Sequence, residues 1–213
     1  HVRAGLAILP YEEADGEVVH LSADSLGLQG TLSATVVNRP ALIAIETFMP
    51  ESKRIARKRQ GMDVPPLPRG LIAVSDLLLV DAGALPETLE EAMETARPSA
   101  RVSPGDQVGV FWELYGADPA ETPQLSASLR LLGDRPGWLR RIAQSAGLLR
   151  EVEPVRIRWS ETIADAPFTA RSLAITIPDV EPGTYTLELS FEAPGREALT
   201  VRQDVEVSAP IAD

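Results

Sequence analysis

The side chains that most often carry out catalysis are scarce in this sequence. Histidine occurs only at His1 and His20, and a Ser-His-Asp triad needs a histidine as its general base. No Gly-x-Ser-x-Gly turn presents a serine nucleophile. Both histidines stand in strand-like or terminal contexts, and we interpret His20 as an ordinary strand residue. The sequence therefore does not predict a catalytic triad.

Motifs for metals and cofactors are also missing. The chain has no cysteine, which excludes thiolate ligands, cysteine nucleophiles and a disulfide framework. It contains no His-Glu-x-x-His pair and no calcium-binding loop, and the Gly-x-x-Gly turn at 27–30 lacks the third glycine of a dinucleotide site. We predict a protein without catalytic residues, metal ligands or cofactors. A glycosidase-like enzyme stays open as an alternative, because the fold sets the distance between facing carboxylates.

Five basic residues stand within a run of seven that contains no acid. They are Lys53, Arg54, Arg57, Lys58 and Arg59. The chain has a formal charge of −11; without these five, fifteen basic residues against thirty-one acidic ones leave −16. This layout predicts an exposed loop that docks onto an acidic protein surface or onto anionic lipid headgroups. A solvated turn is the alternative, and the negative net charge argues against nucleic acid as a partner.

A second candidate binding region is the segment at 136–147. Its apolar residues recur every four positions from Trp138 onward, which predicts a helix with one apolar face. Arg140 and Arg141 point away from that face. We predict that Trp138, Arg140 and Arg141 contact a protein partner, as the five basic residues do.

The aromatic residues leave a carbohydrate-binding module open as another function. Such a module needs two or three coplanar rings exposed on one face or rim. The alternation of strand faces places Trp112 and Trp159 in the core, and Trp138 is the residue best placed for an interface. The exposure of these three tryptophans and of Tyr115 separates a carbohydrate-binding module from a protein scaffold.

Short blocks of alternating polar and apolar residues recur along the chain and predict an all-β fold. The expected strands of the first module lie at 2–9, 17–21, 30–37, 42–48 and 71–80. Those of the second lie at 107–114, 124–132, 154–159, 172–177, 185–192 and 199–207. Pro182-Gly183 before Tyr185 is typical of an immunoglobulin-like or fibronectin-like sandwich in which the tyrosine forms a corner. We expect two antiparallel β-sandwich modules of this kind with short connecting helices.

The expected modules are residues 1–80 and residues 104–213, joined by a linker at 81–103. Apolar residues of the linker share one helical face and glutamates share the other, which predicts a short packed helix at 86–96. Its acidic face is expected to meet solvent. The apolar residues are Leu85, Leu89, Ala92, Met93 and Ala96.

Four blocks of sequence, at 57–62, 70–79, 109–116 and 182–189, are similar in combination to a known family. Together they resemble the C-terminal β-rich region of bacterial proteins of the GWxTD-domain family, from about residue 40 to the end. The Gly-Trp-x-Thr-Asp motif itself is absent, which indicates a shortened relative or a fragment. The resemblance implies a secreted or periplasmic protein without a catalytic role. It also implies an extrinsic subunit of a membrane assembly, such as a photosynthetic reaction-centre or light-harvesting complex.

No apolar run approaches the roughly 20 residues that a transmembrane helix needs. The sequence opens with a strand-like pattern and lacks the features of a signal peptide, so we expect a leader, anchor or further domain to precede His1. Taken together, the residues and the resemblance predict a non-catalytic, extracytoplasmic scaffold or docking subunit. Its expected partners are proteins, in particular subunits of a membrane complex.

Overall fold

The structure, a computed structural model, describes residues 2–11, 18–26, 32–36, 39–63, 71–83, 85–116, 120, 124–133, 155–163, 166 and 168–209. Its regular elements are strands, apart from one helix of six residues. The prediction of an all-β fold is thereby confirmed. No helix among the described residues has the length and apolar character needed to cross a bilayer. The chain divides into an N-terminal unit, residues 1–67, and a C-terminal unit, residues 68–213.

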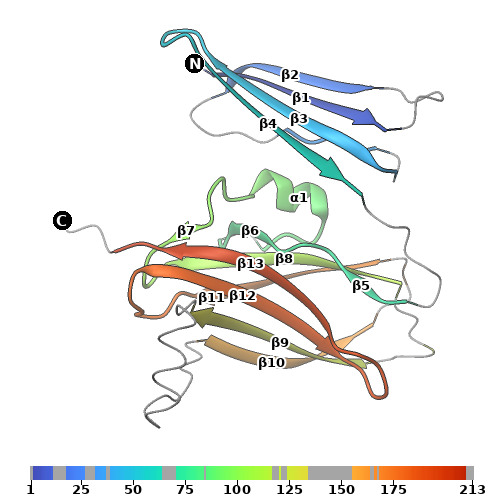
Figure 1. Cartoon of the computed structure of the whole chain (residues 1–213). Coiled ribbons are helices and arrows are strands. Elements are labelled where there is room, and N and C mark those ends of the chain that lie inside the picture. The colour runs from blue at the N-terminus through green and yellow to red at the C-terminus, as the bar shows by residue number, and fades with distance from the viewer. Residues whose placement is uncertain are drawn as a thin grey trace, which may run out of the picture. The chain divides into compact units, whose positions relative to one another are not determined.

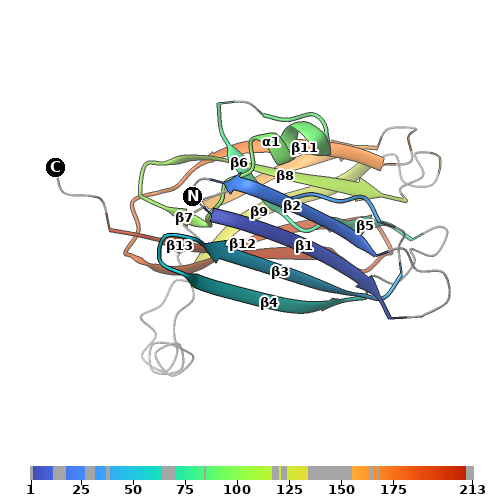
Figure 2. The same cartoon turned by 90° about the horizontal axis from the view of Figure 1, so that it is seen from above.

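The N-terminal unit is one antiparallel sheet with the strand order β2-β1-β3-β4. Figures 1 and 2 show these four strands side by side. Its strands are β1 (Val2–Pro10), β2 (Val19–Leu26), β3 (Ala41–Met49) and β4 (Arg54–Met62). One face buries Leu6, Ile8 and Ala41 beneath apolar side chains of residues 32–36. Those five residues belong to no strand, so the strand predicted at 30–37 is not found in its described part.

The C-terminal unit contains two sheets. The first has the order β10-β9-β12-β13-β7, antiparallel except for the parallel β13–β7 pair. Its strands are β7 (Arg101–Val102), β9 (Gln124–Gly133), β10 (Val155–Thr162), β12 (Gly183–Glu192) and β13 (Leu199–Val207). The second has the order β11-β8-β5, and β6 also pairs with β8. Its strands are β5 (Ala73–Val74), β6 (Leu78–Asp81), β8 (Gln107–Tyr115) and β11 (Phe168–Thr176).

One hydrophobic core joins the two sheets of the C-terminal unit. Alternate residues of β8, including Trp112, meet alternate residues of β9 and β12, including Leu129 and Leu189. The opposite face of β8 forms a smaller cluster in which Phe111 packs with Val80 and with Ala92 of the helix. Strand β8 is therefore buried on both faces, which its nearly continuous apolar sequence requires.

The helix α1 (Leu89–Glu94) begins at Thr88, whose hydroxyl accepts a hydrogen bond from the Glu91 N–H at 3.2 Å. It coincides with the predicted helix at 86–96 but is shorter. Its buried contact is made by Ala92, whereas Leu85 and Leu89, expected on the packed face, are exposed. The glutamates of the helix are exposed, as expected.

The predicted division of the chain needs correction. The segment predicted as the last strand of the first module, 71–80, forms β5 and β6, and both pair with β8 in the C-terminal unit. The predicted linker at 81–103 also belongs to that unit, because α1 packs on its sheet and β7 pairs with β13. Apolar residues of 71–80 and of 81–103 are buried in the C-terminal unit. The boundary between the two units therefore lies after residue 67, earlier than the predicted boundary at residue 80.

Tyr185 makes a local hydrogen bond to the segment that precedes β12. Its hydroxyl donates a hydrogen bond to the carbonyl oxygen of Glu181 at 2.8 Å. The tyrosine thereby fixes the turn at Pro182-Gly183 to the start of β12. The helix predicted at 136–147 lies outside the described residues.

Candidate functional site

The basic residues at 53–59 lie in a β-hairpin and do not form the loop that the sequence predicted. Strand β4 pairs with β3 along its whole length, from Arg54 opposite Met49 to Met62 opposite Ala41. Lys53 closes the turn between the two strands and has a positive φ of 52°. The predicted conformation is therefore wrong, whereas the predicted exposure of this segment is found at every residue from 53 to 59.

Strand β4 is an edge of its sheet. It pairs with β3 on one side, and no described strand pairs with its other side. Eight of its nine residues are exposed, and Ile55 has a relative exposure of 71%. The outer side of such an edge carries backbone N–H and C=O groups that can pair with another chain.

The basic side chains of β4 project from both faces of the strand. Because successive strand residues alternate, Arg54 and Lys58 share one face while Arg57 and Arg59 share the other. Arg57 Nε lies 2.7 Å from Glu46 Oε1 on β3, and both side chains are about half exposed. Among the described residues no other ion pair involves this segment. Four of its five basic residues, counting Lys53, therefore make no ion pair with a described residue.

The other predicted contact residues cannot be placed against this strand. Trp138, Arg140 and Arg141 lie outside the described residues, between the end of β9 and the start of β10. Their predicted role as partner contacts stays a prediction. The candidate docking surface that the structure describes is therefore the hairpin formed by β3 and β4.

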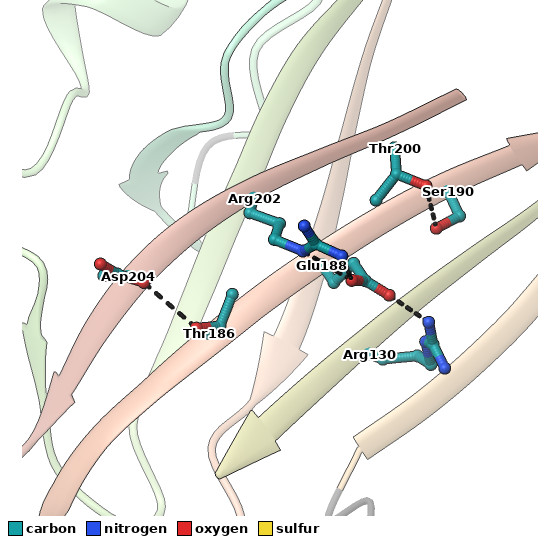
Figure 3. A network of polar contacts seen from close by, with 7 residues as sticks. All are labelled: Arg130, Thr186, Glu188, Ser190, Thr200, Arg202 and Asp204. Carbon is teal, nitrogen blue, oxygen red and sulfur yellow. Dashed lines mark hydrogen bonds and ion pairs between the residues drawn. The ribbon is translucent and has the colours of Figure 1, made fainter. Parts of the chain in front are cut away.

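A second concentration of charge surrounds a buried carboxylate in the C-terminal unit. Glu188 on β12 is only 3% exposed, and it lies between Arg130 of β9 and Arg202 of β13 (Figure 3). Arg130 Nη2 donates to Glu188 Oε1, and Arg202 donates to Oε2 from Nε at 2.8 Å and lies 2.7 Å away through Nη2. Burial raises the pKa of the Glu188 carboxyl, but the two arginines outweigh burial and lower that pKa below its ordinary value.

The strand registers place further arginines beside this cluster on the outer face of the five-stranded sheet. Residues directly opposite one another on paired strands share a face. One row therefore contains, from β10 to β13, Arg156, Arg130, Glu188 and Arg202. The next row contains Arg158, Ser128, Ser190 and Thr200. We call the surface formed by these two rows the arginine face; its four arginines and one glutamate give it a formal charge of +3.

Another buried carboxylate connects the two sheets of the C-terminal unit. Glu161 on β10 accepts hydrogen bonds from Trp159 Nε1 at 3.0 Å and from Arg171 Nε, on β11, at 2.7 Å. Strands β10 and β11 belong to different sheets. The carboxylate therefore ties the edges of the two sheets together, which is a structural role.

A third buried carboxylate belongs to Glu113, which accepts a hydrogen bond from the Tyr115 hydroxyl on the same strand. Burial, followed by this hydrogen bond and the negative charge, raises the pKa of Tyr115 well above its ordinary value. The phenol therefore stays protonated at neutral pH. It acts as a hydrogen-bond donor to the carboxylate.

Neither of two pockets in the described part of the chain has two carboxylates in its lining. The first, in the N-terminal unit, has a volume of about 150 Å³ and is lined mainly by apolar residues such as Ile8 and Met62. The second, in the C-terminal unit, has a volume of about 390 Å³, and Glu197 is the acidic residue in its lining. Neither pocket supplies the paired acids on which glycoside hydrolysis depends.

The aromatic residues with described side chains do not form an exposed row. Trp112 is buried, and it lies 5.9 Å from the ring of Trp159, which is half-buried against the same core. Tyr115 is half-buried beside Phe168, at a ring distance of 6.1 Å, and Phe168 is 47% exposed. These described rings therefore do not supply the coplanar platform that a carbohydrate-binding module needs.

Comparison with known proteins leaves the family of this chain open. No protein-family model matches the chain, and a search of curated proteins finds no match. The resemblance to the GWxTD-domain family therefore stays a prediction.

The arginine face was not predicted, although part of its signal is present in the sequence. Alternation places Arg130, Arg156, Arg158 and Arg202 on the outward sides of their strands. These residues lie far apart in the chain and become neighbours only through the strand order β10-β9-β12-β13. That order is a tertiary property, so scanning for local runs of charge finds β4 and misses the arginine face.

Proposed function

We propose that this chain is a non-catalytic docking subunit whose basic edge strand β4 binds an acidic surface of a protein partner. The observation that carries this proposal is an exposed edge strand with basic side chains on both faces. Four of the five basic residues at 53–59 make no ion pair with a described residue. An acidic partner would supply such pairs.

The edge position adds a second type of contact to the charges. An extended partner segment can pair with the open backbone groups of β4, and its alternating side chains then meet basic residues on both faces. Electrostatic attraction orients the partner and speeds association. This combination favours a protein partner, because lipid headgroups do not provide a strand for backbone pairing.

Basic residues on an edge strand have a competing explanation, since natural sheets use charge to prevent pairing with other sheets. Charge reversal separates the two roles. A strand bearing glutamates is still charged and still protected from aggregation, but it repels an acidic partner. The protective role predicts unchanged binding after reversal, and the docking role predicts a loss.

The proposal includes a finer description of the C-terminal unit as an immunoglobulin-like β-sandwich. Two sheets that share one core, with Val110 from one and Leu129 from the other, support this description. The hydrogen bond from Tyr185 to Glu181 also supports it, because a tyrosine corner is common in such domains. The N-terminal sheet then presents β4 for docking.

The place of action is proposed from the resemblance described above. We propose a bacterial, extracytoplasmic protein that stabilises the subunits of a membrane assembly, and the GWxTD-like blocks support this location and role. This role also agrees with a chain whose described chemistry consists of packing and ion pairs.

The test is purification of the tagged chain from its native source in mild detergent, followed by identification of bound proteins. A variant carrying Arg54→Glu, Arg57→Glu and Arg59→Glu is purified in parallel. The same protein is expected to co-purify with the wild-type chain and to be lost with this variant. Raising the salt concentration from about 0.05 to about 0.5 M should release it from the wild type, because the Debye length shortens several-fold.

A matched control reverses three exposed arginines outside β4, namely Arg3, Arg101 and Arg196. It has the same net charge as the β4 variant, so it should retain the partner if the position of the charge matters. Retention by both variants, or loss from both, contradicts docking through β4. Equal thermal midpoints of the three proteins show that folding is intact, as expected for exposed charges.

A further inference from the structure

A second surface of the chain has the properties of a binding site and lies on the other unit. We propose that the arginine face of the C-terminal unit binds an extended acidic segment of a protein partner. It rests on strands β9, β10, β12 and β13, and none of its residues belongs to β4. The inference therefore goes beyond the proposed function and stands on separate observations.

The first observation is that a buried carboxylate holds two of the arginines in place. Glu188 binds Arg130 on one side and Arg202 on the other, as Figure 3 shows. A side chain that is already ordered loses less conformational freedom when it binds a ligand. The Arg202 side chain is 66% exposed despite its contact with Glu188, so its guanidinium group still reaches solvent.

The second observation is the positive formal charge of these two rows on a chain whose net charge is negative; the adjoining rows of the same face hold Glu192 and Asp204. The arginine face carries +3 within a chain of −11. Arg156 and Arg158 are exposed on β10 and extend the charge to the edge of the sheet. Thr200 is exposed beside the arginines, and its hydroxyl is hydrogen-bonded at 3.0 Å to that of the buried Ser190. Exposed guanidinium groups next to such a hydroxyl offer several donors to carboxylates.

The shape of the surface favours an extended ligand over a small anion. The arginines follow rows across four neighbouring strands, and neither of the two described pockets is lined by any of them. Strands lie about 4.8 Å apart, so a row from β10 to β13 is about 14 Å long. An extended peptide covers that length with about four or five residues. A short acidic segment that crosses the strands therefore matches the rows in length and in charge.

The experiment measures binding of a fluorescent hexaglutamate peptide by anisotropy at about 0.05 M salt, where charge interactions are weakly screened. The protein carries Arg54→Glu, Arg57→Glu and Arg59→Glu, so that β4 cannot contribute. In this background, Arg156→Gln with Arg158→Gln should weaken binding about tenfold, since each exposed charge pair contributes modestly. The control pair, Arg3→Gln with Arg196→Gln, removes the same charge elsewhere and should leave affinity unchanged.

Several results overturn the proposal. They are the absence of peptide binding in the β4-reversed background, equal affinity before and after the two Arg→Gln changes on β10, and an equal loss in the control pair. Binding of phosphatidylglycerol vesicles through these arginines, without binding of the peptide, assigns the face to a membrane surface instead. If the double variant has a lower thermal midpoint, Arg158→Gln alone is used, with an expected weakening of about threefold. Failure here leaves the role of β4 intact, because the charges of that strand are already reversed.

Discussion

Replacing Glu188 by glutamine removes the charge that connects β9, β12 and β13 on the outer face of their sheet. In the native protein one carboxylate oxygen accepts from Arg130 and the other from Arg202. Glutamine has a similar shape but a single acceptor oxygen, so it can satisfy only one arginine. The two guanidinium groups then repel each other without an intervening negative charge.

The size of the effect follows from the exposure of the partners. A hydrogen bond to a charged group contributes about 1.5–3 kcal/mol to stability. The Arg130 and Arg202 side chains are 30% and 66% exposed, so water replaces part of what they lose. We expect Glu188→Gln to lower the free energy of unfolding of the C-terminal unit by about 2 kcal/mol. Arg202→Gln leaves the carboxylate paired with Arg130 and should cost about 0.5–1 kcal/mol.

Urea unfolding followed by tryptophan fluorescence measures these differences. All three tryptophans, Trp112, Trp138 and Trp159, belong to the C-terminal unit, so the signal reports that unit alone. The reasoning is refuted if Glu188→Gln costs no more than Arg202→Gln. In that case the carboxylate would not organise the arginines around it.

Three further predictions concern pH, packing and the hairpin turn. The pKa of Glu188 in the folded protein is lowered from 4.5. The ionised carboxylate therefore stabilises the fold above about pH 4.5, and this stabilisation is lost as pH falls through the folded-state pKa. The difference in the free energy of unfolding between wild type and Glu188→Gln should accordingly become smaller in unfolding curves recorded in acid. Gly109→Ala places a Cβ 2.5 Å from Val80 Cγ2 and should destabilise the C-terminal unit by about 1–3 kcal/mol in urea. Lys53→Gly removes a side chain from a residue with positive φ and should slow amide exchange in the β3–β4 hairpin about two- to fivefold. Unchanged urea unfolding curves for Gly109→Ala contradict the packing assignment. Faster amide exchange in the hairpin of Lys53→Gly contradicts the turn assignment.

The strands with one apolar face were predictable from the sequence. Strands β9, β12 and β13 largely alternate polar and apolar residues, the apolar ones lie in the core, and their predicted ranges agree with the structure to within two residues at either end. Burial of one face enforces a period of two, which is the pattern that a sequence displays. The turn beside Tyr185 was also recognisable from the sequence, because Pro182-Gly183 is a local signal, and the Tyr185 hydroxyl donates a hydrogen bond across it to Glu181.

Strand β4 was missed because it buries almost nothing. Its sequence, from Arg54 to Met62, has charges on both faces and no alternation of polar and apolar residues. Pairing with β3 places Arg57 opposite Glu46, and this cross-strand contact is visible only once the register is known. Strand pairing also decides to which unit residues 71–80 belong, because their apolar side chains could be buried in either core. The arginine face likewise depends on strand order, so neither feature was predictable from the sequence.

The claim that β4 is the docking strand is tested most directly by hydrogen exchange, measured on the full chain with and without the protein that co-purifies with it. Docking through β4 predicts slower exchange of the amides of residues 53–62 in the complex. The same amides should show no slowing when partner is added to the variant with Arg54→Glu, Arg57→Glu and Arg59→Glu. Unchanged exchange in β4 of the wild-type complex, together with slowing elsewhere in the chain, would contradict the account.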